Sequence, residues 1–122
     1  MPFFEIFDFR ATPAQRKAAT ELLTAALCEA YAIKPDIISA YFIDVGDRSY
    51  GHEGFFDEEA TENRVFIKVH AFRRPDQLRR VAARMLTQAV AAAYGTPTKA
   101  VAVYFFDRDP DQVAHDGVLA SD

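Results

Sequence analysis

The sequence contains only one cysteine, Cys28, among its 122 residues. A single cysteine forms no intramolecular disulfide, and it has no partner at a spacing typical of metal ligands. The three histidines also lack such a spacing, so no metal site is expected. Because the chain also has no glycine-rich phosphate loop and no serine or cysteine triad signature, we expect chemistry without a cofactor.

An excess of positive charge is missing as well. The chain has 14 Lys and Arg against 18 Asp and Glu, a formal net charge of −4. A surface that binds phosphates needs clustered basic residues, so nucleic acid is not an expected partner. No apolar stretch approaches the ~20 residues of a membrane helix, and no basic segment followed by an apolar run marks a signal peptide. We therefore expect a cytoplasmic protein with no membrane partner.

The composition, 50% hydrophobic and 26% charged, fits one compact domain over residues 1–122 with a real core. Apolar periodicity and turn signals predict a strand, a helix and a strand, followed by the same three elements again. The first set covers 3–9, 13–32 and 37–45, and the second covers 65–72, 75–94 and 100–107. The prediction is thus two βαβ units, about 2–46 and 64–107, with a C-terminal tail.

The two units look like copies of each other. An offset of 62 positions relates Pro13 to Pro75, and a slip of one relates the segment 40–44 to the segment 103–107. The first helix has its own start signal, since Thr12 can cap it, Pro13 suits the first helical position and Gln15 completes a capping box.

Two tandem βαβ units with right-handed crossovers predict an α+β fold, in which a four-stranded sheet carries both helices on one face. The other face would be bare, and the strand 65–72 is apolar enough on both faces to need cover. We therefore expect an oligomer. The connection 46–63 is longer than a hairpin needs, so it is expected to shape a site or a subunit contact.

Pro2 follows the initiator methionine and leads into the apolar run Phe3-Phe4-Glu5-Ile6-Phe7. Aminopeptidases commonly remove a methionine that precedes a small residue, so we expect a mature chain that opens with a proline amine. Ordinary α-amino groups titrate at roughly 7.7 to 8.0, close enough to neutrality for burial or a nearby cation to make one a base or an acid. If Met1 stays, the nitrogen of Pro2 is an amide and this chemistry is lost.

Arg73 and Arg74 follow the strand 65–72. A guanidinium fork donates two parallel hydrogen bonds to a carboxylate, and adjacent cations lower the pKa of a nearby amine. The same pair can also be a solvated strand end that pairs with surface carboxylates. Tyr104 either packs its ring in an apolar strand or carries its hydroxyl into a site. His115 lies in an acidic tail, where a solvated side chain is the default.

Taken together, Pro2, the duplicated unit and the arginine-rich start of the second helix resemble the tautomerase superfamily, whose members use an amino-terminal proline and build trimers of such double units. Within it, the segment from Val103 to Gly117 is most similar to the cis-3-chloroacrylic acid dehalogenase group. The resemblance covers almost the whole chain and implies a tautomerase/MIF-like fold and a homotrimer.

Residue by residue, the resemblance makes Pro2 the catalytic amine, a base in tautomerisation or an acid in hydration of a small carboxylate substrate. Arg73 and Arg74 fall where the family places two arginines that hold the substrate carboxylate, although the dehalogenase group spaces them apart. Tyr104 matches the active-site tyrosine of the family.

Two positions depart from the family pattern. His115, with Asp116 beside it, stands in place of the water-activating glutamate, and Leu27 stands in place of a histidine of the first helix. These departures favour keto-enol chemistry: a cofactor-independent tautomerase, an isomerase acting on a small 2-keto or unsaturated carboxylic acid. The alternatives are a hydratase or dehalogenase of 3-substituted acrylates, with His115 or Asp116 activating water, and a non-catalytic trimeric binding module of the same fold.

Overall fold

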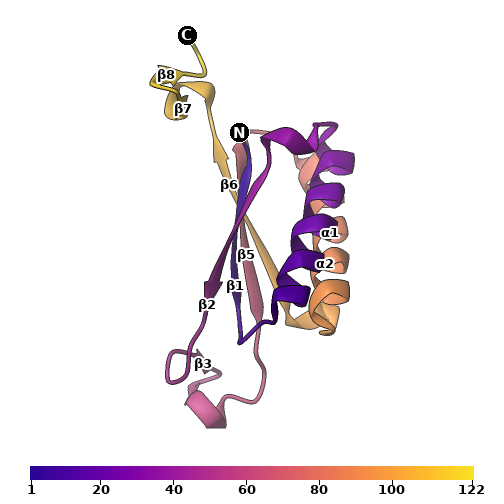
Figure 1. The fold of residues 1–122 in the computed structure, drawn as a ribbon, viewed down its shortest axis with the longest axis vertical. Coiled ribbons are helices and arrows are strands. Elements are labelled where there is room, and N and C mark those ends of the chain that lie inside the picture. The colour runs from indigo at the N-terminus through magenta and orange to yellow at the C-terminus, as the bar shows by residue number, and fades with distance from the viewer.

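The computed structural model describes residues 1–122, and its centre is a four-stranded mixed sheet with two helices on one face (Figure 1). The strands lie in the order β2-β1-β5-β6, with bounds Ser39–Asp44, Phe3–Asp8, Val65–Phe72 and Val101–Arg108. β1 is parallel to β2 and β5 is parallel to β6, while the central pair β1 and β5 is antiparallel. The expected α+β fold with tandem βαβ units is confirmed.

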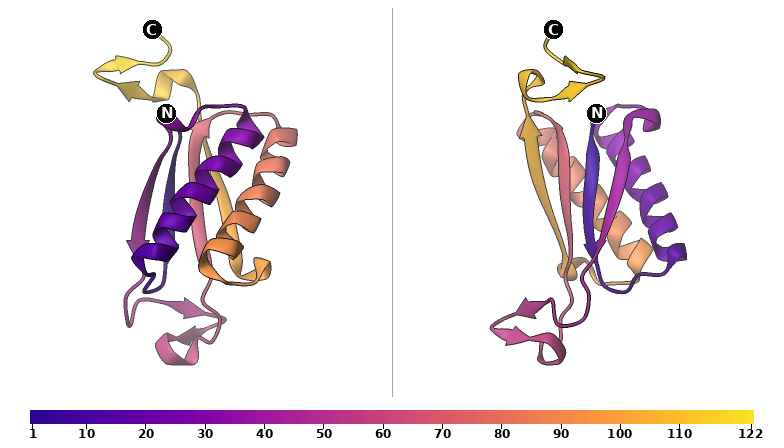
Figure 2. Two further views of the ribbon diagram at one scale, coloured as in Figure 1. Left: turned by 45° about the vertical axis from the view of Figure 1, so that its right-hand side comes forward. Right: turned by 60° about the vertical axis from the view of Figure 1, so that its left-hand side comes forward.

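The helices α1 (Pro13–Tyr31) and α2 (Asp76–Tyr94) lie side by side across one face of the sheet, and both views of Figure 2 show them on the same side. The predicted capping box is present, because Gln15 N–H donates to Thr12 Oγ1 at 3.1 Å and Thr12 N–H donates to Gln15 Oε1 at 2.9 Å. Pro75 is the N-cap of α2 rather than its first residue, so that predicted start is one residue early.

The outer strands also begin later than predicted. Pro35–Ile37 and Thr98–Ala100 form short 3₁₀ turns, and β2 and β6 start only after them. The residue before each turn has extended backbone. Before the first turn it is Lys34, which precedes a proline and is therefore biased toward this conformation, and before the second it is Pro97 itself. The predicted strand starts at 37 and 100 are therefore early by two residues and one residue.

A constant offset of 63 positions relates the two repeats, as the helix starts at Pro13 and Asp76 show. From the sequence the offset was 62 with a slip of one, and the structure corrects this to 63 throughout. Residues buried in one helix have buried equivalents in the other at this offset: Ala19 and Ala82, Leu23 and Leu86, Ala26 and Ala89, and Leu27 and Val90. The two C-caps, Ala32 and Gly95, are equivalent too, and both adopt left-handed backbone.

The core lies between the sheet and the helices, and every second residue of the two central strands points into it. Fully buried side chains there include Phe4, Ile6, Ile67 and Val69. These strand residues close one contiguous core with the buried residues of both helices.

The face of the sheet without helices carries rings from four strands. Phe3, Tyr41, Phe7, Phe66, Tyr104 and Phe106 contact one another or a neighbouring histidine there. Lys68 and His70 also project onto this face, so the expectation that both faces of the strand 65–72 are apolar holds only in part. Lys68 Nζ lies 3.5 Å from Glu5 Oε2 and 5.3 Å from the centre of the Phe7 ring. We call this surface the bare face.

Asp8, at the end of β1, is the one charged side chain that is fully buried. Its Oδ1 accepts from Arg16 Nη2 at 2.8 Å, and its Oδ2 accepts from Arg16 Nε at 3.1 Å and from the Tyr94 hydroxyl at 2.8 Å. The hydrogen bond to Asp8 raises the pKa of the Arg16 guanidinium. One carboxylate thus joins β1 to α1 and α2.

Two smaller structures extend from opposite ends of the sheet (Figure 1). The long connection after β2 forms a hairpin of β3 (Gly51–His52) and β4 (Phe55–Phe56) and a short 3₁₀ turn. The tail after β6 forms a second hairpin, β7 (Ala114–His115) and β8 (Val118–Leu119), whose Asp116-Gly117 turn has positive φ at both residues. Neither α1 nor α2 combines the length and apolar composition that crossing a bilayer requires.

Candidate functional site

Pro2 is buried immediately before β1, and its carbonyl accepts from Ser39 N–H at 3.4 Å. Phe3 pairs with His70, so the same antiparallel register places Pro2 opposite Ala71. Ala71 in turn pairs with Asp107 of β6. Pro2 therefore lies at the end of the sheet where β5 leads into α2 and β6 leads into the tail.

Met1 borders two pockets on the bare face. One of about 500 Å³ is lined by Pro2, Phe3, Glu5 and three residues of β2, Ser39, Tyr41 and Ile43. The other, of about 370 Å³, is lined by residues of β5, β6 and the tail, among them His70, Phe72, Arg108 and Gln112. Met1 thus lies between a mostly apolar pocket and a pocket that is lined in part by the cationic side chain of Arg108.

The two predicted arginines point to different neighbours. Arg73 Nε donates to Asp109 Oδ1 at 3.1 Å, and its side chain is 62% exposed. Arg74 Nη1 donates to the Phe72 carbonyl at 2.7 Å, and its guanidinium lies over the Tyr31 ring, 4.7 Å from the centroid. Within one chain the pair does not converge on one point, and neither arginine lines the pockets beside Met1.

Tyr104 and His115 also lie apart from Pro2 within one chain. Tyr104 is 58% exposed on the bare face and pairs with Lys68, which pairs with Glu5. That row is three residues from Pro2, roughly 10 Å along the strand. His115 is exposed in β7 and pairs with Val118.

Arg108 and His70 were not singled out from the sequence as site residues. Arg108, the last residue of β6, pairs with Phe72 and lines the second pocket beside Met1. His70 stacks on the Phe3 ring at 4.2 Å between centroids, and its Nε2 lies 3.6 Å from Glu5 Oε2. The signal for Arg108 was its place at the end of the last strand, level with the start of the first.

Tyr31, at the end of α1, was not singled out either. It is 5% exposed, and its hydroxyl is buried without a hydrogen-bond partner. Burial raises the pKa of Tyr31, Asp107 raises it further, and Arg74 and Arg79 act against this rise. A buried phenol beside two guanidinium groups is a donor with no acceptor.

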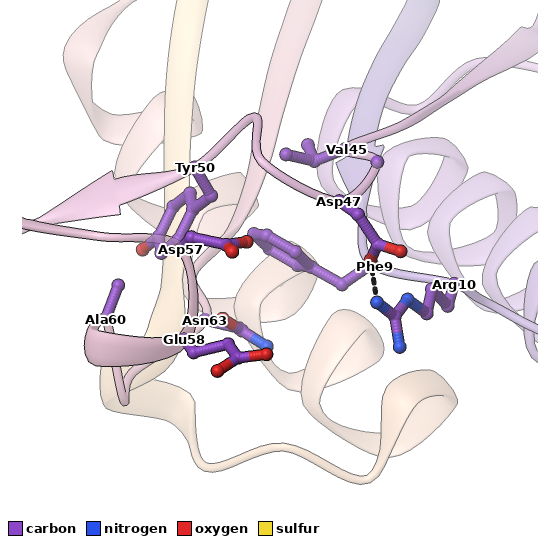
Figure 3. Close-up of a pocket in the computed structure, with 10 residues that line it drawn as sticks. Phe9, Arg10, Val45, Asp47, Tyr50, Asp57, Glu58, Ala60 and Asn63 are labelled. Carbon is purple, nitrogen blue, oxygen red and sulfur yellow. Dashed lines mark ion pairs between the residues drawn. The ribbon is translucent and has the colours of Figure 1, made fainter.

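The long connection does form a pocket, of about 270 Å³, but at the end of the sheet away from Pro2 (Figure 3). Phe9 and Tyr50 lie edge to face in it with 4.8 Å between centroids, and Arg10 forms an ion pair with Asp47 at its edge. β1 separates it from Pro2 by roughly 20 Å. The connection was expected to shape a site or a subunit contact; it lines this pocket, and a role in subunit contact stays a prediction.

His52, Glu53 and Glu62 have ligand atoms within 4.8 Å of one another. Glu53 is 71% exposed, and Glu62 Oε1 lies 3.8 Å from Arg64 Nε. His52 Nδ1 lies 3.8 Å from Glu53 Oε1, so each member of the cluster already faces another polar group.

No protein-family model matches the sequence, and no curated protein matches it. Solved structures do. A native fused 4-OT superposes with a TM-score of 0.91 at 17% identity, covering 98% of this chain and 96% of the other. A symmetric trimer of wild-type fused 4-OT gives 0.86 at 20% identity, with the same coverage. A member of the cis-3-chloroacrylic acid dehalogenase (cis-CaaD) family gives 0.82 at 18% identity, covering 96% and 82%. The chain therefore has the same fold as these fused 4-OT and cis-CaaD family structures.

Proposed function

We propose that the protein is a cofactor-independent tautomerase that acts on a small 2-keto or unsaturated carboxylic acid and uses the Pro2 amine as general base after removal of Met1. The observation that carries this proposal is the position of Pro2, buried at the open end of the sheet with Met1 bordering two pockets. Loss of Met1 joins the two pockets in front of the new amine. A substrate there meets the nitrogen directly.

The chemistry is a proton transfer between two atoms of the substrate. The amine takes a proton from the carbon next to the keto group, the C–H electron pair forms the enolate, and the ammonium returns the proton at another atom. In this proposal Arg74 turns from the Tyr31 ring to hold the carboxylate, and Arg73 lies at the edge of the site. Arg108 borders the same space and supplies a positive charge for the enolate oxygen.

A homotrimer completes the site in this proposal. The bare face has no helix and carries Tyr41 and Tyr104 with 59% and 58% of their surface exposed. A contiguous aromatic surface of this kind is typical of an interface. One of the superposed fused 4-OT structures is described as a symmetric trimer. In such an assembly, Tyr104 of one copy would lie close to Pro2 of a neighbouring copy, although it does not reach Pro2 of its own chain.

The test is the pH dependence of phenylpyruvate ketonisation by the mature protein and by a protein whose proline amine is blocked. We expect activity that rises through a single pKa and disappears on blocking. Intact mass must first show that Met1 is absent, since a retained Met1 leaves an amide and favours a binding module. Activity that survives blocking would overturn the role of Pro2.

Hydration or dehalogenation of a 3-substituted acrylate is the second candidate. It is favoured by the superposition on a cis-CaaD family member and by the β7-β8 hairpin, which carries His115 and Asp116 at the same end of the sheet as Pro2 (Figure 1). His115 or Asp116 would activate the water, and the Pro2 ammonium would protonate the neighbouring carbon. Chloride release from 3-chloroacrylate well above background would support it, and its absence would leave the tautomerase.

A further inference from the structure

The inner strand of the first repeat, β1, ends at Asp8, a buried carboxylate whose Oδ2 accepts hydrogen bonds from two donors. Asp8 Oδ2 accepts from Arg16 Nε at 3.1 Å and from the Tyr94 hydroxyl at 2.8 Å. Asp8 is 0% exposed, and the tyrosine that bonds to it comes from the helix of the other repeat.

The second repeat keeps the donors and lacks the carboxylate. At the offset of 63 that relates the helices, Arg79 is the equivalent of Arg16, Tyr31 is the equivalent of Tyr94, and Ala71 is the equivalent of Asp8. The strand pairing agrees, because Asp8 pairs with Asp44 in the first repeat and Ala71 pairs with Asp107 in the second.

The two donors that meet on Asp8 Oδ2 are unused in the second repeat. The Tyr31 hydroxyl is buried and has no partner. Arg79 donates through Nη1 to Asp107 and to the Arg74 carbonyl, both at 2.6 Å, and through Nη2 to Asp76. Its Nε, the atom that in Arg16 reaches Asp8, makes no hydrogen bond. The Arg79 side chain is 28% exposed, so water can reach it, but the Tyr31 hydroxyl is a buried donor without an acceptor, which is rare and needs an explanation.

Ala71 belongs to the candidate site, because it lies opposite Pro2 in the β1-β5 register and lines the pocket between Met1 and Arg108. Arg74 covers the Tyr31 ring and forms no ion pair of its own. The charged groups that face Tyr31 are Arg74, Arg79 and Asp107. Asp107 accepts from Arg79 Nη1, and this bond leaves Arg79 Nε and the Tyr31 hydroxyl without a carboxylate partner.

We propose that the space beside Ala71 is the subsite for the carboxylate of the ligand, which takes the place that the Asp8 side chain fills in the first repeat. Tyr31 and Arg79 Nε donate to it, and Arg74 turns from the Tyr31 ring toward it. This rests on the proposed function only in that the ligand is a small carboxylic acid bound beside Pro2. The second repeat thus differs from the first by one carboxylate, and in this proposal the ligand supplies it.

The test compares Tyr31→Phe with Tyr94→Phe, since each removes one hydroxyl from equivalent positions. The probe is phenylacetate, a carboxylate that the protein cannot tautomerise, and its binding to the mature protein is measured by calorimetry. We expect Tyr31→Phe to weaken binding about tenfold or more, because the lost hydrogen bond is to a charged group. Tyr94→Phe should keep the wild-type dissociation constant. Equal binding by wild type and Tyr31→Phe, or no binding by the wild type, would overturn the proposal.

Ala71→Asp restores the missing carboxylate. We expect this variant to melt no lower than wild type and to lose phenylacetate binding, since its own side chain fills the subsite. A folded Ala71→Asp protein that still binds phenylacetate as wild type does would overturn the proposal. If the variant does not fold, the comparison of phenylacetate binding by Tyr31→Phe and Tyr94→Phe is the test. Phenylpyruvate turnover is measured separately. Binding that depends on Tyr31 without any turnover by wild type would defeat the proposed function and leave this subsite standing.

Discussion

Tyr94, the last residue of α2, donates its hydroxyl to Asp8 at the end of β1, with 2.8 Å between the two oxygens. The two residues belong to different repeats and are 86 positions apart. Because Asp8 also binds Arg16 of α1, this one contact ties the second helix to the strand and helix of the first repeat. The contact adds to the β1-β5 pairing and the shared core that join the two βαβ units.

Asp8→Asn should be strongly destabilising. The substitution leaves Arg16 without its carboxylate in a place where Asp8 is fully buried, and breaking a buried pair from one side costs about 3 kcal/mol or more. Arg16 is 32% exposed and regains some hydration, so we expect about 2–4 kcal/mol in the free energy of unfolding by urea. Asp47→Asn is the control, since it removes an ion pair whose partners are 75% and 68% exposed. A similar small loss from both variants would contradict a structural role for Asp8.

Tyr94→Phe should make the protein less sensitive to alkali. Burial and the hydrogen bond to Asp8 raise the pKa of Tyr94, so the folded state holds this proton more tightly than the unfolded state does. The stabilisation is therefore complete below the unfolded pKa of ~10 and is lost as pH rises above it. Melting temperatures from pH 8 to 11.5 should show wild type ahead of Tyr94→Phe near neutrality, with the two curves meeting near pH ~11. Parallel curves over the whole pH range would show that the folded state does not hold the Tyr94 proton more tightly than the unfolded state does.

Phe66→Glu should produce monomers if the bare face is covered by copies of the chain. Phe66 stacks on Phe7 at 5.5 Å and meets Tyr104 edge to face at 4.9 Å, so a carboxylate there lies in the middle of the aromatic surface. Desolvating an unpaired charge opposes association. Light scattering should give a trimer mass for wild type and a monomer mass for the variant. Gln77→Glu on the exposed surface of α2 adds the same charge as a control. A trimer in both variants, or a monomer in wild type, would remove the bare face as the interface.

The elements of the fold could be predicted from local patterns. Apolar periodicity and turn signals predicted the four main strands and both helices, and Thr12 with Pro13 and Gln15 fixed the start of α1. The sequence offset was off by one in the helix starts because proline is the N-cap in one helix and the first residue in the other.

The candidate site was harder to predict from the sequence, because its residues come together only through strand register and helix packing. Nothing local to Tyr31 or Ala71 shows that a carboxylate is missing there. The absence becomes visible only when Asp8, Arg16 and Tyr94 are seen in contact. Arg73 and Arg74, adjacent in sequence, diverge because one turns to the tail and the other to α1.

Arg108→Met and Tyr31→Phe should separate turnover from binding. Arg108 lines the pocket beside Met1 on the bare face, whereas the Tyr31 side chain is buried on the helix side, so a substrate at Pro2 meets the two groups from opposite sides. If Arg108 stabilises the developing enolate, its loss lowers kcat for phenylpyruvate ketonisation by about tenfold to a hundredfold and changes KM less. Tyr31 holds a carboxylate that is charged throughout the reaction, so its loss raises KM and leaves kcat nearly unchanged. Arg80→Met, on the exposed surface of α2, removes the same charge and should change neither constant. A rise in KM alone for Arg108→Met would place the carboxylate on the bare face and reverse the orientation of the substrate in the site.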